Sequence, residues 1–225
     1  MHGVLTRMKF FFALFAVLIP AGPLRISPQA RDLIVEFETG GQAYYNARLQ
    51  HPEWPGGASG VTVGIGYDCG YNSRSGILTD WQALPEGSRN ALASTAGIKG
   101  ISAKPRASAL KWIIVPWVTA QDLFVLGTMP RFGQMTASAF PGILSTHGHV
   151  QGAMLSIVFN RGASMAGDGR REMRAIRSCV AAGTLQPIPV QIRSMKRLWI
   201  GKGLPGLLRR RDAEAALIES SFQWP

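Results

Sequence analysis

The chain has 225 residues, a length that suits one domain with room for a hydrophobic core. Its hydrophobic content of 46% excludes an intrinsically disordered protein. The formal net charge of +11 favours anionic partners such as nucleic acid, lipid headgroups or cell-wall polymers, without choosing among them. The two cysteines, Cys69 and Cys179, are too few for a disulfide framework. We expect two buried thiols, with a single disulfide as the alternative.

The N-terminal segment, residues 1–22, has the pattern of an export signal. Arg7 and Lys9 precede an apolar run at 10–19, and small residues follow. This order is typical of a secretory signal, and the run is too short to span a bilayer comfortably. Because the usual small-residue cleavage triplet is missing, an uncleaved, releasable membrane anchor is the alternative. We expect an exported protein, either periplasmic or extracellular.

A first helix is predicted from residue 28 and places a carboxylate near its end. Ser27 and Pro28 are a start signal, because serine caps a helix and proline suits the first helical position. Thr39-Gly40-Gly41 ends the helix just after Glu38. There the helix dipole and partial burial would both raise the pKa of Glu38, which suits a general acid. An exposed glutamate near a helix cap is the alternative.

A small β hairpin is predicted next. Residues 42–59 are expected to be irregular, with a strand starting at Tyr44-Tyr45. Residues 60–68 then alternate glycines with β-branched residues, which favours a strand with a bulge or a close approach. We expect the hairpin to face Glu38 and to carry Thr62 and Asp68. The alternative is that Thr62 is an ordinary strand residue and that Asp68 only forms a turn.

The remainder is expected to be helical with breaks. Interrupted helices are predicted between 80 and 126, a loop at 132–144, and a central core helix at 150–159. The next helix carries four arginines on one face, which is either a solvated face or a docking face for an anionic partner: Arg170, Arg171, Arg174 and Arg177. Further helices are predicted at 190–199 and after a glycine-rich loop at 201–206.

The residues support carboxylate chemistry best. No His, Cys, Asp and Glu cluster has metal-ligand spacing, and phosphate loops and Ser or Cys nucleophile signatures are absent. We therefore expect no metal and no cofactor. Glycoside hydrolysis needs one carboxyl to protonate the leaving oxygen and a second group to activate water. We assign Glu38 as the general acid, Asp68 as the group that takes the water proton, and Thr62 as the residue that holds the water.

Three motifs resemble the phage-type (T4-like) lysozymes and endolysins, which are glycoside hydrolases of family 24. The first is Phe37-Glu38-Thr39-Gly40, followed by Tyr45 and by the strand Thr62-Val63-Gly64-Ile65-Gly66. The second is an apolar helix that ends Phe159-Asn160-Arg161-Gly162. The third, at 199–214, is similar to the family's closing glycine loop and helix. In this order the motifs define a catalytic domain over residues 27–222.

The resemblance implies an α+β, mainly helical, lysozyme-like fold with a small β-hairpin lobe and a helical lobe. It implies a monomer that cleaves the β-1,4 bond between N-acetylmuramic acid and N-acetylglucosamine in peptidoglycan. Its substrate contacts would be Tyr45, Gly64, Tyr67 and Asn160. Peptidoglycan is the expected partner, with electrostatic contact to an anionic wall or membrane surface and no nucleic acid.

The chain also departs from this family. Ala47 stands where simpler members carry the second carboxylate, and Asp68 fits the pesticin-like branch, in which an aspartate follows the threonine. Residues 75–146 match poorly and are expected to be an insertion or a lid. Three other functions stay open: a non-catalytic peptidoglycan-binding protein that keeps the fold, a lytic transglycosylase that uses Glu38 alone, and a basic membrane-disrupting protein.

Overall fold

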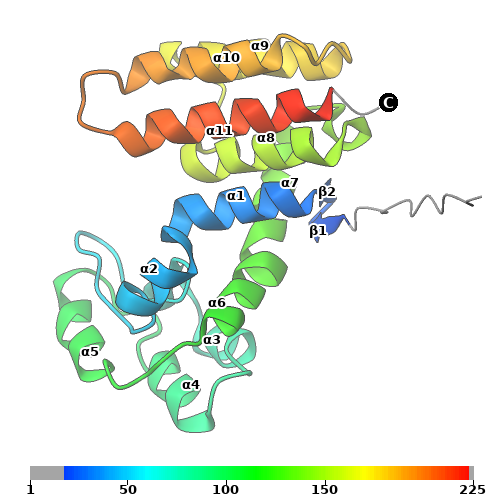
Figure 1. Ribbon diagram of the computed structural model, residues 1–225. Helices are drawn as coiled ribbons and strands as arrows, with labels where there is room; N and C mark the ends of the chain where they lie inside the picture. The colour runs from blue at the N-terminus through cyan, green and yellow to red at the C-terminus, as the bar shows by residue number, and fades with distance from the viewer. Residues whose placement is uncertain (1–17, 223–225) are drawn as a thin grey trace, which may run out of the picture.

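The computed structural model describes residues 18–222, which are mainly helical with two small antiparallel sheets. The mainly helical α+β class predicted from the sequence is confirmed. Figure 1 shows a larger helical lobe, a smaller lobe that contains the β hairpin, and a long helix that runs between them. None of the helices in residues 18–222 is long and apolar enough to cross a membrane.

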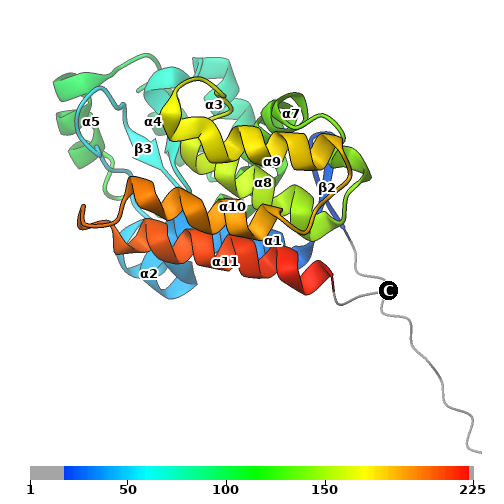
Figure 2. The same cartoon turned by 90° about the horizontal axis from the view of Figure 1, so that it is seen from above.

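The larger lobe is built around α8, the predicted central helix. The lobe comprises α1 (Pro28–Thr39), α8 (Gly148–Arg161), α9 (Arg171–Ala181), α10 (Ile188–Ser194) and α11 (Pro205–Ser221). The helix α8 packs against α1, α11, the strand β2 (Leu24–Ile26) and the helix α7 (Met129–Ala139). Figure 1 shows α9 and α10 as a further layer next to α11, and Figure 2 shows α10 beside α11 from above. Every residue from 148 to 158 is buried as a result, more than the single apolar face predicted. Gly152 permits the close contact with α1, because a Cβ there would lie 2.1 Å from the Cβ of Ala30.

A short hairpin, β1 (Ile19–Ala21) and β2 (Leu24–Ile26), precedes α1 and belongs to the core. Ile19 pairs with Ile26 and Ala21 with Leu24, and three of these four side chains are fully buried. The predicted signal segment ends at residue 22, so β1 falls inside it, and loss of residues 1–22 would take β1 out of the fold. Residues 1–17, with the basic start of that segment, lie outside the described residues.

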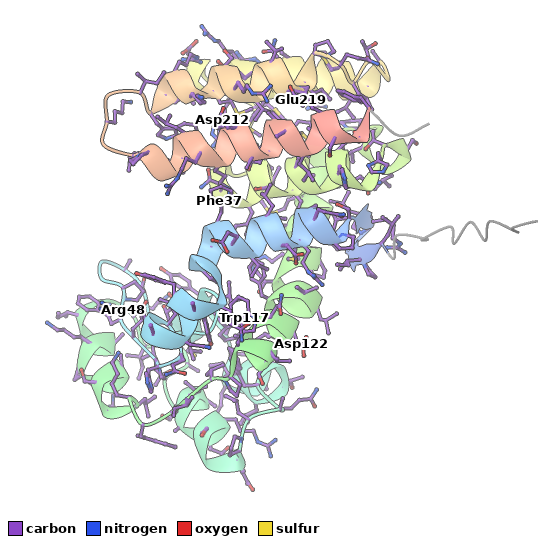
Figure 3. The ribbon with its side chains drawn as sticks, in the orientation of Figure 1. Phe37, Arg48, Trp117, Asp122, Asp212 and Glu219 are labelled. Atoms are coloured by element: carbon purple, nitrogen blue, oxygen red, sulfur yellow. The ribbon has the colours of Figure 1, made fainter. Side chains whose placement is uncertain are left out.

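The smaller lobe begins directly after α1. Ser27 caps α1 as predicted, and Gly40 ends it with a φ of 70° and turns the chain into α2 (Gly41–Arg48). The strand predicted at Tyr45 is wrong, and the irregular segment predicted over residues 42–59 is helical as far as residue 48 and irregular after it. Tyrosine favours strands, but here its ring is buried edge-on against Trp117, with ring centres 5.2 Å apart. Trp117 is labelled in Figure 3.

A β hairpin that carries Thr62 and Asp68 is present as predicted, but the single strand expected over residues 60–68 is broken by a turn. The hairpin consists of β3 (Thr62–Val63) and β4 (Tyr67–Asp68), with Thr62 opposite Asp68. The turn between the strands contains Gly64 and Gly66, whose φ angles of 65° and 71° are unstrained only for glycine. The helices α3 (Arg74–Asp80), α4 (Glu86–Ala93) and α5 (Ala103–Ala109) complete the lobe.

A continuous helix connects the two lobes. It consists of α6 (Trp117–Leu123), a π-helical turn η3 (Phe124–Thr128) and α7 (Met129–Ala139). The loop predicted at 132–144 is therefore helical as far as residue 139. Pro130 is tolerated because the wider π turn displaces the carbonyl that its ring would otherwise meet four residues back. Residues 75–146, predicted as an insertion or lid, contribute to both lobes.

The arginines of α9 are less free than the sequence suggests. Arg170 and Arg174 donate to backbone carbonyls at the end of α8 and in the loop after it. Arg171 contacts Glu172, which is buried. Of the four, Arg177 is the one whose side chain makes no hydrogen bond or ion pair among residues 18–222. Most of this face therefore supports the fold of the larger lobe, which weakens the interpretation as a docking face.

We expect Gly133→Ala to destabilise the protein by about 1–3 kcal/mol, as overpacking does. An added Cβ at this position of α7 would lie 1.8 Å from the carbonyl oxygen of Ala21 in β1. The control is Gly87→Ala in α4, where a Cβ meets nothing within 4 Å and should stabilise by roughly 0.4–1 kcal/mol. Urea denaturation measures both changes. Unchanged stability of Gly133→Ala would contradict the packing of α7 on β1.

Cys69 and Cys179 are free thiols, and only Cys69 is fully buried. Burial raises the pKa of the Cys69 thiol to about 12, and the thiolate is the reactive form. A thiol reagent at about pH 8 should therefore modify the Cys179→Ser variant only after urea is added. The Cys69→Ser variant should react in the folded state. Rapid reaction of folded Cys179→Ser protein would contradict the burial of Cys69.

Candidate active site

Glu38 lies in the last turn of α1 and is held by a buried arginine of α11. The guanidinium Nη1 of Arg210 is 2.6 Å from the Glu38 Oε1, while the Glu38 side chain remains 23% exposed. The Arg210 Nε lies 3.1 Å from the Ser156 hydroxyl and 3.3 Å from the Glu214 Oε1. The ends of α1, α8 and α11 thus fix the carboxylate together.

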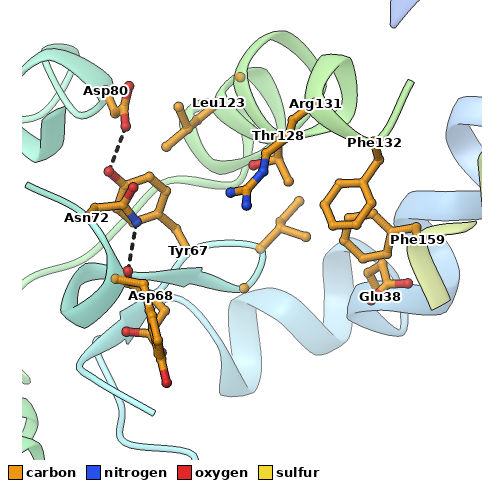
Figure 4. Close-up of a pocket in the computed structure, with 14 residues that line it drawn as sticks. Glu38, Tyr67, Asp68, Asn72, Asp80, Leu123, Thr128, Arg131, Phe132 and Phe159 are labelled. Atoms are coloured by element: carbon orange, nitrogen blue, oxygen red, sulfur yellow. Dashed lines mark hydrogen bonds between the residues drawn. The ribbon is translucent and has the colours of Figure 1, made fainter. Parts of the chain in front are cut away.

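Glu38 borders three cavities. One of about 540 Å³ lies between the lobes and is lined by the β hairpin, α3 and the α6–α7 helix. Another of about 810 Å³ lies between α1 and the loop before α11. The third, about 210 Å³, lies between Glu38 and the hairpin. Figure 4 shows the first cavity, with Glu38 on one side and Asp68 on the other. A long ligand could therefore extend past Glu38 in more than one direction.

The smallest of these cavities also contains Glu53 and Thr62. The two backbones pair in an antiparallel bridge, with N–H···O distances of 2.9 and 2.8 Å in the two directions. Residues directly opposite in such a pair place their side chains on the same face. The Glu53 side chain is half-buried, and within residues 18–222 it has no hydrogen bond or ion pair. A free carboxylate and a hydroxyl therefore face Glu38 across one small space.

Asp68, the predicted second carboxylate, is engaged by the backbone. Both of its carboxylate oxygens accept from the Gly60 N–H, at 3.0 and 2.9 Å, and its Oδ1 also accepts from the Gly70 N–H at 2.8 Å. The side chain thereby caps the short helical turn η1 (Cys69–Tyr71) and ties it to the hairpin. Its assignment as the group that activates water stays a prediction, although both oxygens already accept backbone hydrogen bonds. The alternative interpretation, a turn-forming aspartate, fits these contacts.

The predicted substrate contacts lie in different surroundings. Tyr45 is wholly buried and its hydroxyl donates to a backbone carbonyl at 3.0 Å, so it is a core residue and the predicted contact is wrong. Tyr67 lines the 540 Å³ cavity, and its hydroxyl donates to the Asp80 Oδ2 at 2.6 Å. Gly64 lines the 210 Å³ cavity, and Asn160 lines the 810 Å³ cavity.

Sequence reasoning missed two members of the site, Glu53 and Arg210. Glu53 is the only acidic residue between Glu38 and Asp68 in the sequence, and this could have marked it as a candidate for the second carboxylate. It was passed over because the prolines and glycines around it indicate a loop. Arg210 belongs to the closing motif of the resemblance, but no local pattern indicates that it meets a carboxylate 172 positions earlier.

A metal centre finds no support in the side chains. Between residues 18 and 222, no group of three or more His, Cys, Asp and Glu is placed to hold a metal ion. His147 and His149 lie at the start of α8 and make local contacts there. The Nδ1 of His147 accepts from the backbone N–H of His149 at 3.2 Å. The Nδ1 of His149 lies 2.7 Å from the Ser27 hydroxyl.

No protein-family model matches this chain, and no curated protein matches it. The resemblance to phage-type lysozymes therefore rests on the three motifs. These motifs meet in space, because Glu38 of the first contacts Arg210 of the third and Phe159 of the second lines the same cavity as Glu38. The meeting of distant motifs around one carboxylate marks this region as the candidate active site.

We expect Asp68→Ala to lose about 1.5–3 kcal/mol of stability, because the Gly60 and Gly70 amides lose a charged acceptor. Asp68→Asn keeps one oxygen that can accept from both amides. Its activity should stay within a few-fold of the wild type, with a smaller loss of stability. Thermal denaturation and a wall-hydrolysis assay measure the two effects. A stable but inactive Asp68→Asn protein would restore Asp68 as the catalytic carboxylate.

Proposed function

We propose that the protein is a muramidase, a glycoside hydrolase that cleaves the β-1,4 bond between N-acetylmuramic acid and N-acetylglucosamine in peptidoglycan. The observation that carries the proposal is that Glu38, Glu53 and Thr62 border one cavity of about 210 Å³. Two carboxyl groups that face a common space are what glycoside hydrolysis requires. A lysozyme-like fold is part of the proposal. The two lobes, the helix-end glutamate and the β hairpin support it.

Glu38 is the general acid in this proposal. It gives its proton to the oxygen of the leaving sugar as the glycosidic bond breaks. The carboxylate that forms is stabilised by Arg210, whose guanidinium lies 2.6 Å away. Because the negative charge develops only as the proton leaves, this contact favours the transition state over the protonated enzyme. The buried contacts of Arg210 keep it in place during the step.

Glu53 takes the role that the sequence assigned to Asp68. A water molecule between the Glu53 carboxylate and the Thr62 hydroxyl would be held in line with the sugar carbon. Glu53 would accept the water proton as the oxygen attacks from the face opposite the leaving group. The Thr62 hydroxyl is available for this, since its contact with the Gly60 carbonyl is long, at 3.5 Å. The result is hydrolysis by inversion.

The shape and charge of the protein support this substrate class. Cavities on several sides of Glu38 suit a long polymer better than a small molecule. A net charge of +11 favours approach to an anionic wall or membrane surface. We propose a monomer that acts after export, as the signal pattern in residues 1–22 indicates. A non-catalytic wall-binding protein and a lytic transglycosylase are the alternatives.

Glu38→Gln should abolish the clearing of purified sacculi, and Glu53→Gln should slow it by about 10²–10⁴-fold, because each removes a proton-transfer group. Neither change should unfold the protein, because glutamine keeps the size of the side chain. Glu86→Gln is the control, since Glu86 is an exposed carboxylate at the start of α4, away from the site. If the wild-type protein clears no sacculi, the hydrolase proposal fails and wall binding becomes the better function.

Mass spectrometry of the released fragments separates the two enzyme classes. Hydrolysis by water should leave reducing N-acetylmuramic acid ends. A lytic transglycosylase would leave anhydro ends, because it uses one acid and an internal hydroxyl in place of water. The free carboxylate of Glu53 beside Thr62 favours reducing ends. Anhydro ends together with full activity of Glu53→Gln would replace the muramidase proposal.

A further inference from the structure

The inter-lobe cavity contains an arginine that has no protein partner. Arg131 lies on α7, one turn after the π-helical turn, and its side chain is exposed and lines the cavity of about 540 Å³. Figure 4 shows its guanidinium in the middle of this cavity, between Tyr67 and Phe132. In the part of the chain that the structure describes, the Arg131 side chain makes no hydrogen bond or ion pair. Five guanidinium donors therefore face the space where a ligand would lie.

The carboxylates that line the same cavity already have hydrogen-bond or ion-pair partners within the protein. Glu38 is paired with Arg210, and Asp68 accepts from two backbone amides. Asp80 accepts from the Tyr67 hydroxyl at 2.6 Å, and Figure 4 places it at the far side of the cavity from Phe132. None of these carboxylates lies within ion-pair distance of Arg131. The positive charge of Arg131 is thus left for something outside the protein.

We infer that Arg131 binds a carboxylate carried by the wall glycan. The inference rests on the proposed function and narrows its substrate class. A guanidinium matches a carboxylate through two parallel hydrogen bonds, which a neutral sugar cannot offer. In peptidoglycan, carboxylates occur on the peptide attached to N-acetylmuramic acid, or on its lactyl group where the peptide is missing. A neutral chitin chain has neither. Arg131 would therefore select substituted wall glycan over plain N-acetylglucosamine polymers.

The cavity has room and suitable surroundings for such a substituent. Asn72 and Thr128 also line the cavity, and the Phe132 and Phe159 rings supply an apolar wall. These two rings pack at an angle of 48° with centres 4.4 Å apart, which gives the wall a fixed position. A sugar ring can lie against the aromatic surface while its acidic substituent reaches the guanidinium. The glycan backbone would then pass Glu38 at the edge of the same cavity.

The test measures binding of three monosaccharide ligands that the enzyme cannot cleave. N-acetylglucosamine is neutral, N-acetylmuramic acid adds the lactyl carboxylate, and N-acetylmuramyl dipeptide adds a peptide carboxylate. We expect Arg131→Gln to weaken binding of an acidic ligand about fivefold to tenfold, the loss of one charge-assisted pair, and to leave the neutral ligand unchanged. Arg131→Lys should recover part of the loss. Arg106→Gln is the matched control, since Arg106 is an exposed arginine on α5 outside this cavity.

The outcomes show which carboxylate Arg131 binds and whether the inference holds. Weaker binding of N-acetylmuramic acid alone points to the lactyl carboxylate, which is a neutral amide in the dipeptide. Weaker binding of the dipeptide alone points to the peptide carboxylate, and weaker binding of both means that Arg131 accepts either one. Equal affinities of Arg131→Gln and wild type for all three ligands would overturn the inference, as would an equal loss for all three. Because none of the ligands is cleaved, the result stands apart from the hydrolase proposal, which the clearing of sacculi tests.

Discussion

A buried ion cluster between α1, α8 and α11 is the constraint on which the candidate site depends. Arg210 lies between two carboxylates, Glu38 and Glu214, and Ser156 binds it from α8. Arg211 contacts the same Glu214 at 2.8 Å. Leaving one such charge without its partner in the interior is strongly unfavourable. The three helices are therefore held in one arrangement, and the last helix of the chain fixes a residue near its beginning.

The hairpin supplies the opposite side of the site through a simple arrangement of backbone pairs. Thr62 has Glu53 on one side and Asp68 on the other, so two carboxylates flank one hydroxyl. The amides of Gly60 and Gly70 bind one of these carboxylates, and the other is left facing Glu38. The two acids are chemically alike. Their different surroundings come from which backbone N–H groups lie within reach of each.

Local chemistry was enough to predict the start and end of α1, the hairpin and the core helix, because caps, glycines and apolar spacing act over a few residues. It was not enough for contacts between distant segments. Glu53 stands in a turn-rich loop, and only its pairing with Thr62 brings it to the site. Tyr45 is helical because Trp117, far along the chain, buries its ring. Pro130 indicated a loop, yet the π turn before it accommodates the ring within a helix.

The two connections between the lobes are both interrupted where they pass the cleft. The first changes direction at Gly40, between α1 and α2, and the second carries the π turn between α6 and α7. Such points absorb backbone rotation more easily than regular helix does. A hinge axis through these two points would let the smaller lobe swing as a rigid body. Tyr67 belongs to the smaller lobe and Arg131 to α7, beyond the π turn, so a swing would change the width of the cavity that both residues line.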